Sequence, residues 1–169
     1  SLVGSEMCIR DRRTIVGALV GVNLAIAGAV LQAVMRNPLA DPHIIGISSG
    51  AGLAGVTIMI LFPTLEYLIT PAAFIGAMLA AVCIYILAWK NGIKPVRIIL
   101  AGVAVSAFLS AGISGLMIFY SDRVHGALMW MVGGLAARSW PHVSIILPYA
   151  IAGVLLAFIL SLIHISEPT

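Results

Sequence analysis

Charged side chains are scarce in this sequence, and their scarcity excludes an ordinary soluble domain. Asp, Glu, Lys and Arg make up 9% of the 169 residues and hydrophobic residues 62%, whereas a soluble domain carries about 25% charged residues. The composition therefore predicts a membrane protein. The net charge of +3 comes from basic residues in short gaps between apolar runs, not from the basic face that nucleic-acid binding requires. We expect a lipid bilayer, and no nucleic acid, among the partners.

Cysteine is also rare, and the two that occur, Cys8 and Cys83, are far apart. Without a CxxC or metal-ligand spacing they predict neither a disulfide framework nor a metal site. His125 and His142 lack the spacing of a metal-binding helix, and the order of the residues suggests no Ser-His-Asp or Cys-His pairing. We therefore expect no catalytic residue, no metal and no cofactor in this chain.

Five apolar runs are long enough to cross a bilayer, which takes about 20 mostly apolar residues. None of them contains Asp, Glu, Lys or Arg, each of which costs about 2.5–3.5 kcal/mol at the bilayer centre. The predicted fold is all-α, a polytopic membrane helical bundle. The five expected spans are about 15–35, 44–62, 71–89, 98–120 and 143–160.

Polar segments with helix-breaking residues separate the spans. The gaps at 36–43, 63–70 and 90–95 are short, so we expect turns or loops there. The fourth gap, 121–142, is longer and contains a moderately apolar stretch that ends at Gly133 and Gly134. That stretch is too short and too polar to span, which predicts an interfacial half-helix with tryptophans at headgroup depth.

Lysine and arginine set an expected orientation. Four of them fall in turns on one side of the spans and three on the other. By the positive-inside rule the first set is cytoplasmic, by a margin of four to three. The first set is Arg36, Lys90, Lys94 and Arg97, and the second is Arg13, Arg123 and Arg138.

Small residues recur at every fourth position within the first, second and fourth spans. Residues four apart share a helix face, and small side chains there let membrane helices approach closely. We therefore expect helix-packing seams. Their glycines are Gly17, Gly21, Gly46, Gly50 and Gly102.

Polar residues inside the spans leave two interpretations open. Packing is favoured, because Ser hydroxyls can bond carbonyls of the preceding turn and amides can bond neighbouring helices. The other interpretation is the wall of a translocation path. The residues concerned are Asn23, Gln32, Ser106, Ser110 and Ser114.

A G-x-G-x-x-G pattern occurs at Gly50, Gly52 and Gly55. A dinucleotide fingerprint needs a strand before it and an acid about 20 residues later. Here the glycines lie within an apolar span, and the next acid, Glu66, comes 11 residues after Gly55. We do not expect a nucleotide to bind.

The turn before this pattern is stiffened by two prolines and contains one acid. Asp41 is expected to cap the second span, with its carboxylate at the positive end of the helix dipole. A rigid capped turn is the simpler interpretation, and a contact for a partner protein is the alternative. The turn consists of Asn37, Pro38, Leu39, Ala40, Asp41 and Pro42.

Two stretches contain motifs of one membrane-protein family. The first carries A-G-A-x-x-Q, N-P-L-A-[DE]-P and L-G-[IV]-S-[SN]-G-A elements at residues 27–32, 37–42 and 46–51. The second is 97–111, followed by a W-x-x-G-[SG]-[LF] element within 130–140. With these elements the sequence resembles the FecCD-type permease family, the membrane subunits of ABC importers for iron-siderophore complexes, haem and cobalamin.

The resemblance implies a permease of ten spans, of which this chain would hold the second to sixth. In that family two permease subunits pair around a central path, two ATPase subunits bind the cytoplasmic face, and an external binding protein delivers the ligand. The chain would then lie in the bacterial plasma (inner) membrane and transport by alternating access, with ATP hydrolysed on the partner.

The same resemblance assigns sides to two groups of residues. The turn at 37–42 would face the cytoplasm as a candidate ATPase contact. The side of the external binding protein would hold Arg123, Trp130, Arg138 and Trp140.

An ion-gradient-driven secondary transporter is the alternative function. Such carriers usually show charged residues or broken helices at the midplane, and the expected spans lack Asp, Glu, Lys and Arg. Residues 1–12 and 161–169 resemble translated adapter sequence, so we expect them to be non-native tails around a partial permease domain at 13–160.

Overall fold

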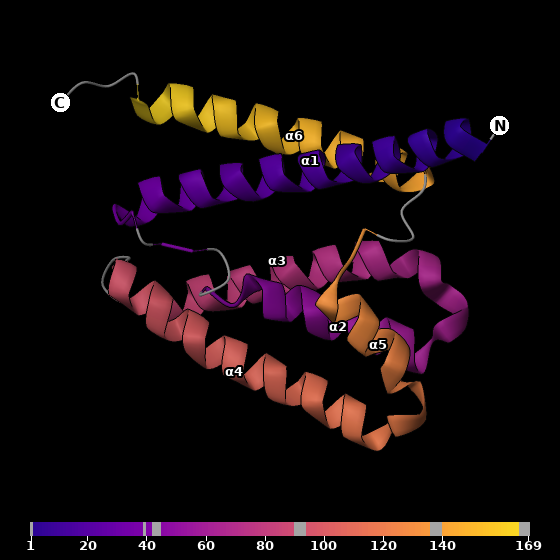
Figure 1. The fold of residues 1–169 in the computed structure, drawn as a ribbon. Coiled ribbons are helices and arrows are strands. Elements are labelled where there is room, and N and C mark those ends of the chain that lie inside the picture. The colour runs from indigo at the N-terminus through magenta and orange to yellow at the C-terminus, as the bar shows by residue number, and fades with distance from the viewer. Residues whose placement is uncertain (1, 39, 42–44, 90–93, 136–139, 166–169) are drawn as a thin grey trace. The chain divides into compact units, whose positions relative to one another are not determined.

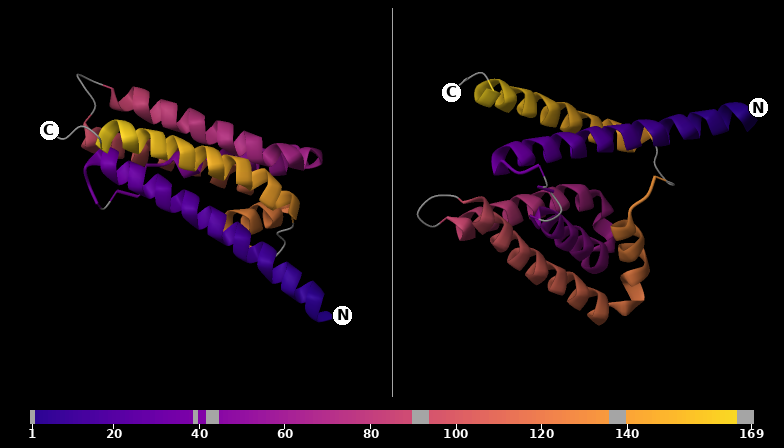
Figure 2. Two further views of the ribbon diagram at one scale, coloured as in Figure 1. Left: turned by 90° about the horizontal axis from the view of Figure 1, so that it is seen from above. Right: turned by 60° about the vertical axis from the view of Figure 1, so that its left-hand side comes forward.

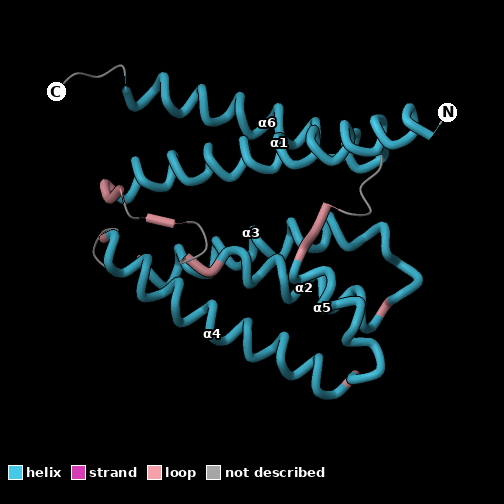
Figure 3. The backbone as a smooth tube through the Cα atoms, viewed as in Figure 1, coloured by secondary structure: helices cyan, strands magenta, loops and turns pink. Residues whose placement is uncertain are grey.

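The computed structural model describes residues 2–38, 40–41, 45–89, 94–135 and 140–165. Within those ranges the chain forms helices and connecting turns and no strand (Figure 3). The all-α prediction is therefore confirmed. In chain order the elements are α1 (Leu2–Met35), α2 (Ile47–Leu61), η1 (Pro63–Leu68), α3 (Ile69–Ala88), α4 (Pro95–Phe119), η2 (Ser121–Arg123), α5 (Val124–Val132) and α6 (Trp140–Ile165).

The helices fall into membrane-length and shorter groups. Asp11–Met35, Pro63–Ala88 and Pro95–Phe119 are long and apolar enough to cross a bilayer. Two further apolar stretches are shorter, Ile47–Leu61, which is α2, and Val143–Ile159, which lies within the 26-residue helix α6. At 1.5 Å per residue, the 15 residues of α2 extend about 22 Å, less than the roughly 30 Å hydrocarbon core. The predicted count of five spans is therefore approximate.

The chain divides into two compact units. The first consists of Ser1–Pro38 and Gly134–Thr169 and holds α1 and α6, and the second consists of Leu39–Gly133 and holds α2 to α5. Within the first unit α1 and α6 pack side by side, as the indigo and yellow ribbons show (Figures 1 and 2). Where they meet, Asn23 Oδ1 lies 3.2 Å from the position that a Cβ on Gly153 would occupy.

Helix α2 is the centre of the second unit, because α3, α4 and α5 all contact it. Its side chains Val56 and Ile60 are fully buried and form a core cluster with Ile113 of α4 and Ala127 of α5. The cluster lies toward the C-terminal end of α2. It therefore joins the short helix α5 to the rest of the unit.

The expected half-helix is present as α5, which has nine residues and ends at Gly133. Gly133 has a φ of 74°, a left-handed conformation that glycine adopts at little cost and that commonly ends helices. In the segment expected to be a loop at 63–70, residues Pro63–Leu68 form the 3₁₀ helix η1, and α3 begins directly after it at Ile69. Trp140, expected in the fourth gap, is the first residue of α6.

The predicted Asp41 cap of the second span is wrong. Helix α2 begins at Ile47, and its N-cap residue is Gly46, with a φ of 83°. An added Cβ on Gly46 would lie 2.7 Å from the carbonyl oxygen of Gly102 on α4. The start of α2 is therefore fixed by this close contact with α4, and Asp41 lies too far before it to be the N-cap.

Two backbone hydrogen bonds end α1 and begin the turn that follows it. Asn37 N donates to Gln32 O at 3.1 Å, and Arg36 N donates to Ala33 O at 3.3 Å. This pair of bonds is a Schellman motif, which requires a left-handed residue at the position of Arg36. Arg36 has a φ of 48° and is the one non-glycine residue with positive φ among those described.

Candidate functional site

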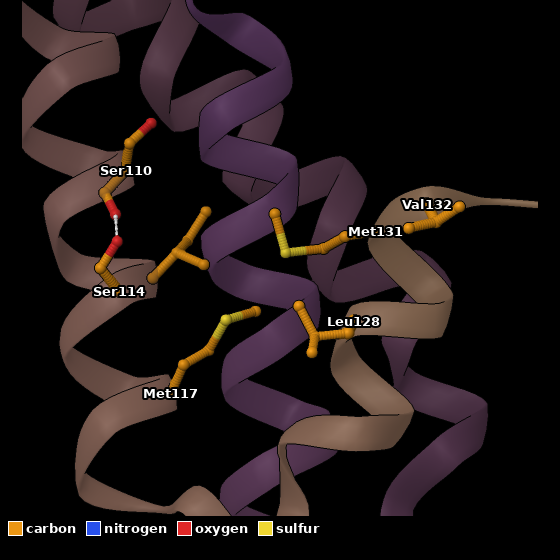
Figure 4. A pocket seen from close by; sticks show the side chains of 7 residues that line it. Ser110, Ser114, Met117, Leu128, Met131 and Val132 are labelled. Atoms are coloured by element: carbon orange, nitrogen blue, oxygen red, sulfur yellow. Dashed lines mark hydrogen bonds between the residues drawn. The ribbon is translucent and has the colours of Figure 1, made fainter.

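A pocket of about 390 Å³ lies between α4 and α5 (Figure 4). The α4 wall carries Ser110 and Ser114, and the α5 wall carries Leu128, Met131 and Val132. Ser114 Oγ donates to the backbone carbonyl of Ser110 at 3.0 Å. The pocket is therefore mainly apolar with a weakly polar side, a surface suited to a ligand with a large apolar body.

Two methionine side chains make the shape of this pocket adjustable. Met117 of α4 and Met131 of α5 both line it (Figure 4), and methionine side chains are unbranched and polarisable, so they adjust to irregular shapes. Sequence reasoning identified the serines but missed the methionines. The spacing of Ser110, Ser114 and Met117 along one helical face was available as a signal, whereas the facing residues of α5 depend on tertiary structure.

Ser106 continues the serine row toward the start of α4 but does not line this pocket. Its Oγ lies 2.8 Å from Ser49 Oγ of α2, and either hydroxyl can be the donor. The structure thus brings together two of the three serines, Ser110 and Ser114, and uses Ser106 to join two helices. The geometry of Ser106 therefore supports the packing interpretation.

The two amides of the path set, Asn23 and Gln32, belong to α1 in the first unit. Asn23 Nδ2 donates to Leu19 O at 2.8 Å, one turn earlier in the same helix. Its Oδ1 faces Gly153 of α6. Asn23 therefore satisfies its donor locally and lies at a close approach of two helices, while Gln32 is exposed.

A second, larger pocket of about 840 Å³ lies among α2, α3 and α4 and is lined almost entirely by apolar side chains. The hydroxyl of Thr57, one of its few polar groups, donates to Leu53 O at 2.6 Å within α2. Cys83 of α3 also lines it and is exposed. Such a surface matches hydrocarbon and offers little to orient a polar ligand.

Each glycine of the G-x-G-x-x-G pattern faces a different helix. An added Cβ would lie 2.5 Å from Gly76 O of α3 at Gly50, 3.3 Å from Ile113 Cδ1 of α4 at Gly52, and 2.5 Å from Trp130 Cη2 of α5 at Gly55. In an α-helix Gly52 and Gly55 are rotated by about 200° and about 140° from Gly50. The spacing of the three glycines therefore allows α3, α4 and α5 to approach α2 closely on different sides.

The other glycines of the expected seams differ from one another. Gly46 and Gly102 lie at the contact between the start of α2 and α4, where each added Cβ would approach a backbone oxygen closely. At Gly17 it would lie 3.3 Å from Leu135 Cδ1, a side-chain tip. At Gly21 nothing lies within 4 Å in the described chain, so a packing role for Gly21 stays a prediction.

The proline-rich turn is partly described. Asn37, Pro38 and Asp41 are exposed, and Ala40 is half-buried. Leu39 and Pro42 lie outside the described residues. The turn follows the Schellman motif that ends α1, so its first half has a backbone role that the sequence prediction did not include.

Of the residues expected on the side of the external binding protein, Arg123 and Trp130 belong to the second unit and Trp140 to the first. Arg123 Nη1 donates to the carbonyl oxygen of Ile60 at 2.7 Å, and Trp130 packs on Gly55. Both thus contact α2. Trp140 begins α6, where the guanidinium carbon of Arg12 lies 5.9 Å from its ring centroid, within the range of a cation–π contact. Arg138 lies outside the described residues.

Among the residues that the structure describes, no group of three or more His, Cys, Asp or Glu side chains is arranged to hold a metal ion. The α4–α5 pocket is the candidate site that contains residues expected to line a translocation path, Ser110 and Ser114. It is held in place by the contacts of α5 with α2.

Comparisons with known proteins give this surface a context. The chain is 42% identical over 153 residues to the cobalamin import system permease protein BtuC of Halobacterium salinarum, an alignment that covers 89% of the chain and 42% of that protein. It is 40% identical over 138 residues to the Fe(3+)-citrate import system permease protein YfmE of Bacillus subtilis, covering 81% and 41%. The Fe(3+) dicitrate transport system permease protein FecD of Escherichia coli is 36% identical over 140 residues, covering 82% and 43%.

A solved structure agrees with these sequence relatives. It is described as an inward-facing conformation of a metal-chelate type ABC transporter, and it matches with a TM-score of 0.77 and 27% identity over 90% of this chain and 48% of that one. The chain spans less than half the length of each of these proteins. The family model of the FecCD transport family matches residues 6–162, and the chain, a multi-pass membrane protein, belongs to that family.

Proposed function

We propose that this chain is part of the membrane-spanning permease subunit of an ATP-driven ABC importer for iron-siderophore, haem or cobalamin-type ligands. The observation that carries the proposal is the family match over residues 6–162, together with relatives named as iron-citrate and cobalamin import permeases. Nothing in the comparisons favours an ion-gradient-driven carrier. The subunit moves its ligand by alternating access and lies in the bacterial plasma (inner) membrane.

The chemistry of ATP belongs to other chains in this proposal. The complex contains a second permease subunit, two ATPase subunits on the cytoplasmic face and an external binding protein. The absence of a catalytic constellation from the sequence fits a subunit that only forms the path. The ligand passes a wall that includes the α4–α5 pocket, whose apolar and weakly polar lining suits chelates with large apolar bodies.

The experiment uses the full-length permease with its partner subunits in proteoliposomes. Uptake of ferric citrate, a ferric hydroxamate and cobalamin is measured with ATP inside, with and without the binding protein, and with an ATPase subunit that cannot hydrolyse ATP. ATP-dependent uptake of one of these ligands is the expected result. Uptake that continues without ATP and collapses when an ionophore is added would overturn the proposal.

A role for the proline-rich turn is part of the same proposal. Asp41 is exposed on that turn, which we place at the ATPase subunit. Asp41→Ala in the complete transporter should lower uptake and the ATPase stimulation by ligand-loaded binding protein. Normal stimulation and uptake in a well-expressed variant would limit Asp41 to a structural part in the turn.

A further inference from the structure

Arg123 reaches from the connection between α4 and α5 to the end of a different helix. Its Nη1 donates to the carbonyl oxygen of Ile60 at 2.7 Å, and Ile60 is the second-last residue of α2. The last four carbonyls of an α-helix lack partners within the helix. A cationic donor at this end satisfies one of them and interacts favourably with the helix dipole.

A second contact holds α5 to α2 about two turns further along α5. The indole ring of Trp130 lies so close to Gly55 that an added Cβ there would be 2.5 Å from Trp130 Cη2. Between the two contacts, Ala127 is buried in the cluster with Val56 and Ile60. Helix α5 is therefore fixed to the C-terminal half of α2 at both of its ends.

The position of α5 determines the shape of the pocket, because Leu128, Met131 and Val132 form one of its walls (Figure 4). The opposite wall belongs to α4. Helix α5 has nine residues, too few to be stable by itself in water. Its place relative to α4 depends on its contacts with α2.

We propose that Arg123 is a positioning residue, which fixes α5 on the end of α2 through the Ile60 carbonyl and thereby sets the width of the α4–α5 pocket. The sequence placed Arg123 among residues that face an external protein. In the structure one of its N–H donors instead binds a carbonyl of the same chain, that of Ile60. The link from pocket width to transport rests on the proposed function, whereas the link from Arg123 to the position of α5 does not.

The test measures whether α5 stays on α2. In the full-length permease complex in lipid nanodiscs, with native cysteines replaced by alanine, Ala127→Cys places a thiol at a site that is 1% exposed. The rate of its modification by a charged methanethiosulfonate reagent is measured without ligand and without ATP. If Arg123 only capped the Ile60 carbonyl and did not hold α5 in place, replacing Arg123 would leave this labelling rate unchanged.

Three variants are compared with this parent. Arg123→Met removes the donors and keeps an unbranched apolar side chain, so modification of the introduced thiol should become about fivefold faster or more. Arg123→Lys retains a cationic donor and should give a rate between the parent and Arg123→Met. Asp122→Asn alters the neighbouring exposed charge and serves as the matched control, in which the thiol should be modified at the parent rate.

A parent rate in Arg123→Met would overturn the proposal. An equal increase in Asp122→Asn would overturn it as well, because the effect would then follow from any change in this segment and not from the Arg123 donor. If Arg123→Met does not assemble, Arg123→Leu, which also lacks a hydrogen-bond donor, takes its place with the same expectation. Since the labelling needs no transport, a transporter that proved independent of ATP would overturn the proposed function and leave this result standing.

Discussion

Ser49 of α2 and Ser106 of α4 share a hydrogen bond of 2.8 Å between their hydroxyl oxygens. The bond lies close to the left-handed Gly46, whose added Cβ would also contact the Cβ of Ser106 at 3.0 Å. In a membrane few forces other than packing and hydrogen bonds hold helices together. This pair therefore contributes to the joint between the start of α2 and α4.

A double-mutant cycle measures that contribution. Ser49→Ala and Ser106→Ala in the full-length permease should each destabilise it, and the double variant should lose less than the sum. The expected coupling is about 0.6 kcal/mol, the usual size for hydrogen bonds between membrane helices. Unfolding in mixed micelles gives the free energies. Ser114→Ala combined with Ser49→Ala is the control without coupling, because Ser114 bonds within α4; equal coupling there would contradict the assignment.

Gly50 should not accept even one additional carbon. A Cβ at Gly50 would lie 2.5 Å from the carbonyl oxygen of Gly76 and 2.5 Å from the Cβ of Ala80, so α2 and α3 would have to separate. We expect Gly50→Ala to destabilise the permease by about 1–3 kcal/mol and Gly50→Leu to lower the yield of folded protein. The thermal midpoint and the yield in detergent are the measurements.

Gly115→Ala is the matched control for that prediction. Gly115 is also helical, but an added Cβ there meets nothing within 4 Å in the described chain. Replacing a helical glycine by alanine in open space should stabilise by up to about 1 kcal/mol. Similar midpoints for Gly50→Ala and Gly115→Ala would show that the close approach of α2 and α3 is not tight.

The other two glycines of the pattern should differ from each other. At Gly55 the added Cβ would meet the rigid indole of Trp130 at 2.5 Å, whereas at Gly52 it would meet the flexible tip of Ile113 at 3.3 Å. Gly55→Ala should therefore be more destabilising than Gly52→Ala, by about 1 kcal/mol or more. The thermal midpoints of the two variants give the order of stability. The reverse order would contradict the packing of Trp130 against α2.

The long helices could be predicted from sequence because the bilayer imposes a length and an apolar composition on a spanning helix. The end of α5 could also be predicted, since Gly133 and Gly134 are local signals that end a helix. These features depend on residues that are neighbours in the chain. For the same reason the family resemblance was accessible from the elements at 37–42 and 46–51.

Other features depend on residues far apart in the chain. Arg123 binds a backbone carbonyl 63 residues earlier, and any residue type can supply a carbonyl, so no sequence pattern indicates the pair. The start of α2 at Ile47 depends on the contact of Gly46 with Gly102. That contact outweighs the capping preference of Asp41. The capping preference could be predicted from neighbouring residues, whereas the contact could not.

Arg36 occupies a backbone position that favours glycine, and its replacement should stabilise the end of α1. With a φ of 48° it is the left-handed residue of the Schellman motif, a conformation that costs a residue with a Cβ about 1–2 kcal/mol. Part of that cost returns through the greater freedom of glycine in the unfolded chain. We expect Arg36→Gly to raise the stability of the full-length permease by about 0.5–1 kcal/mol, measured as the free energy of unfolding in mixed micelles.

Two control variants separate the backbone from the charge. Arg36→Ala removes the charge and keeps the strained backbone, so it should not stabilise the permease. Arg36→Asn should lie between the Gly and Ala variants, because asparagine tolerates this conformation. Equal stability of the Gly and Ala variants would mean that the gain comes from losing the charge, and the left-handed turn at Arg36 would then have to be rejected.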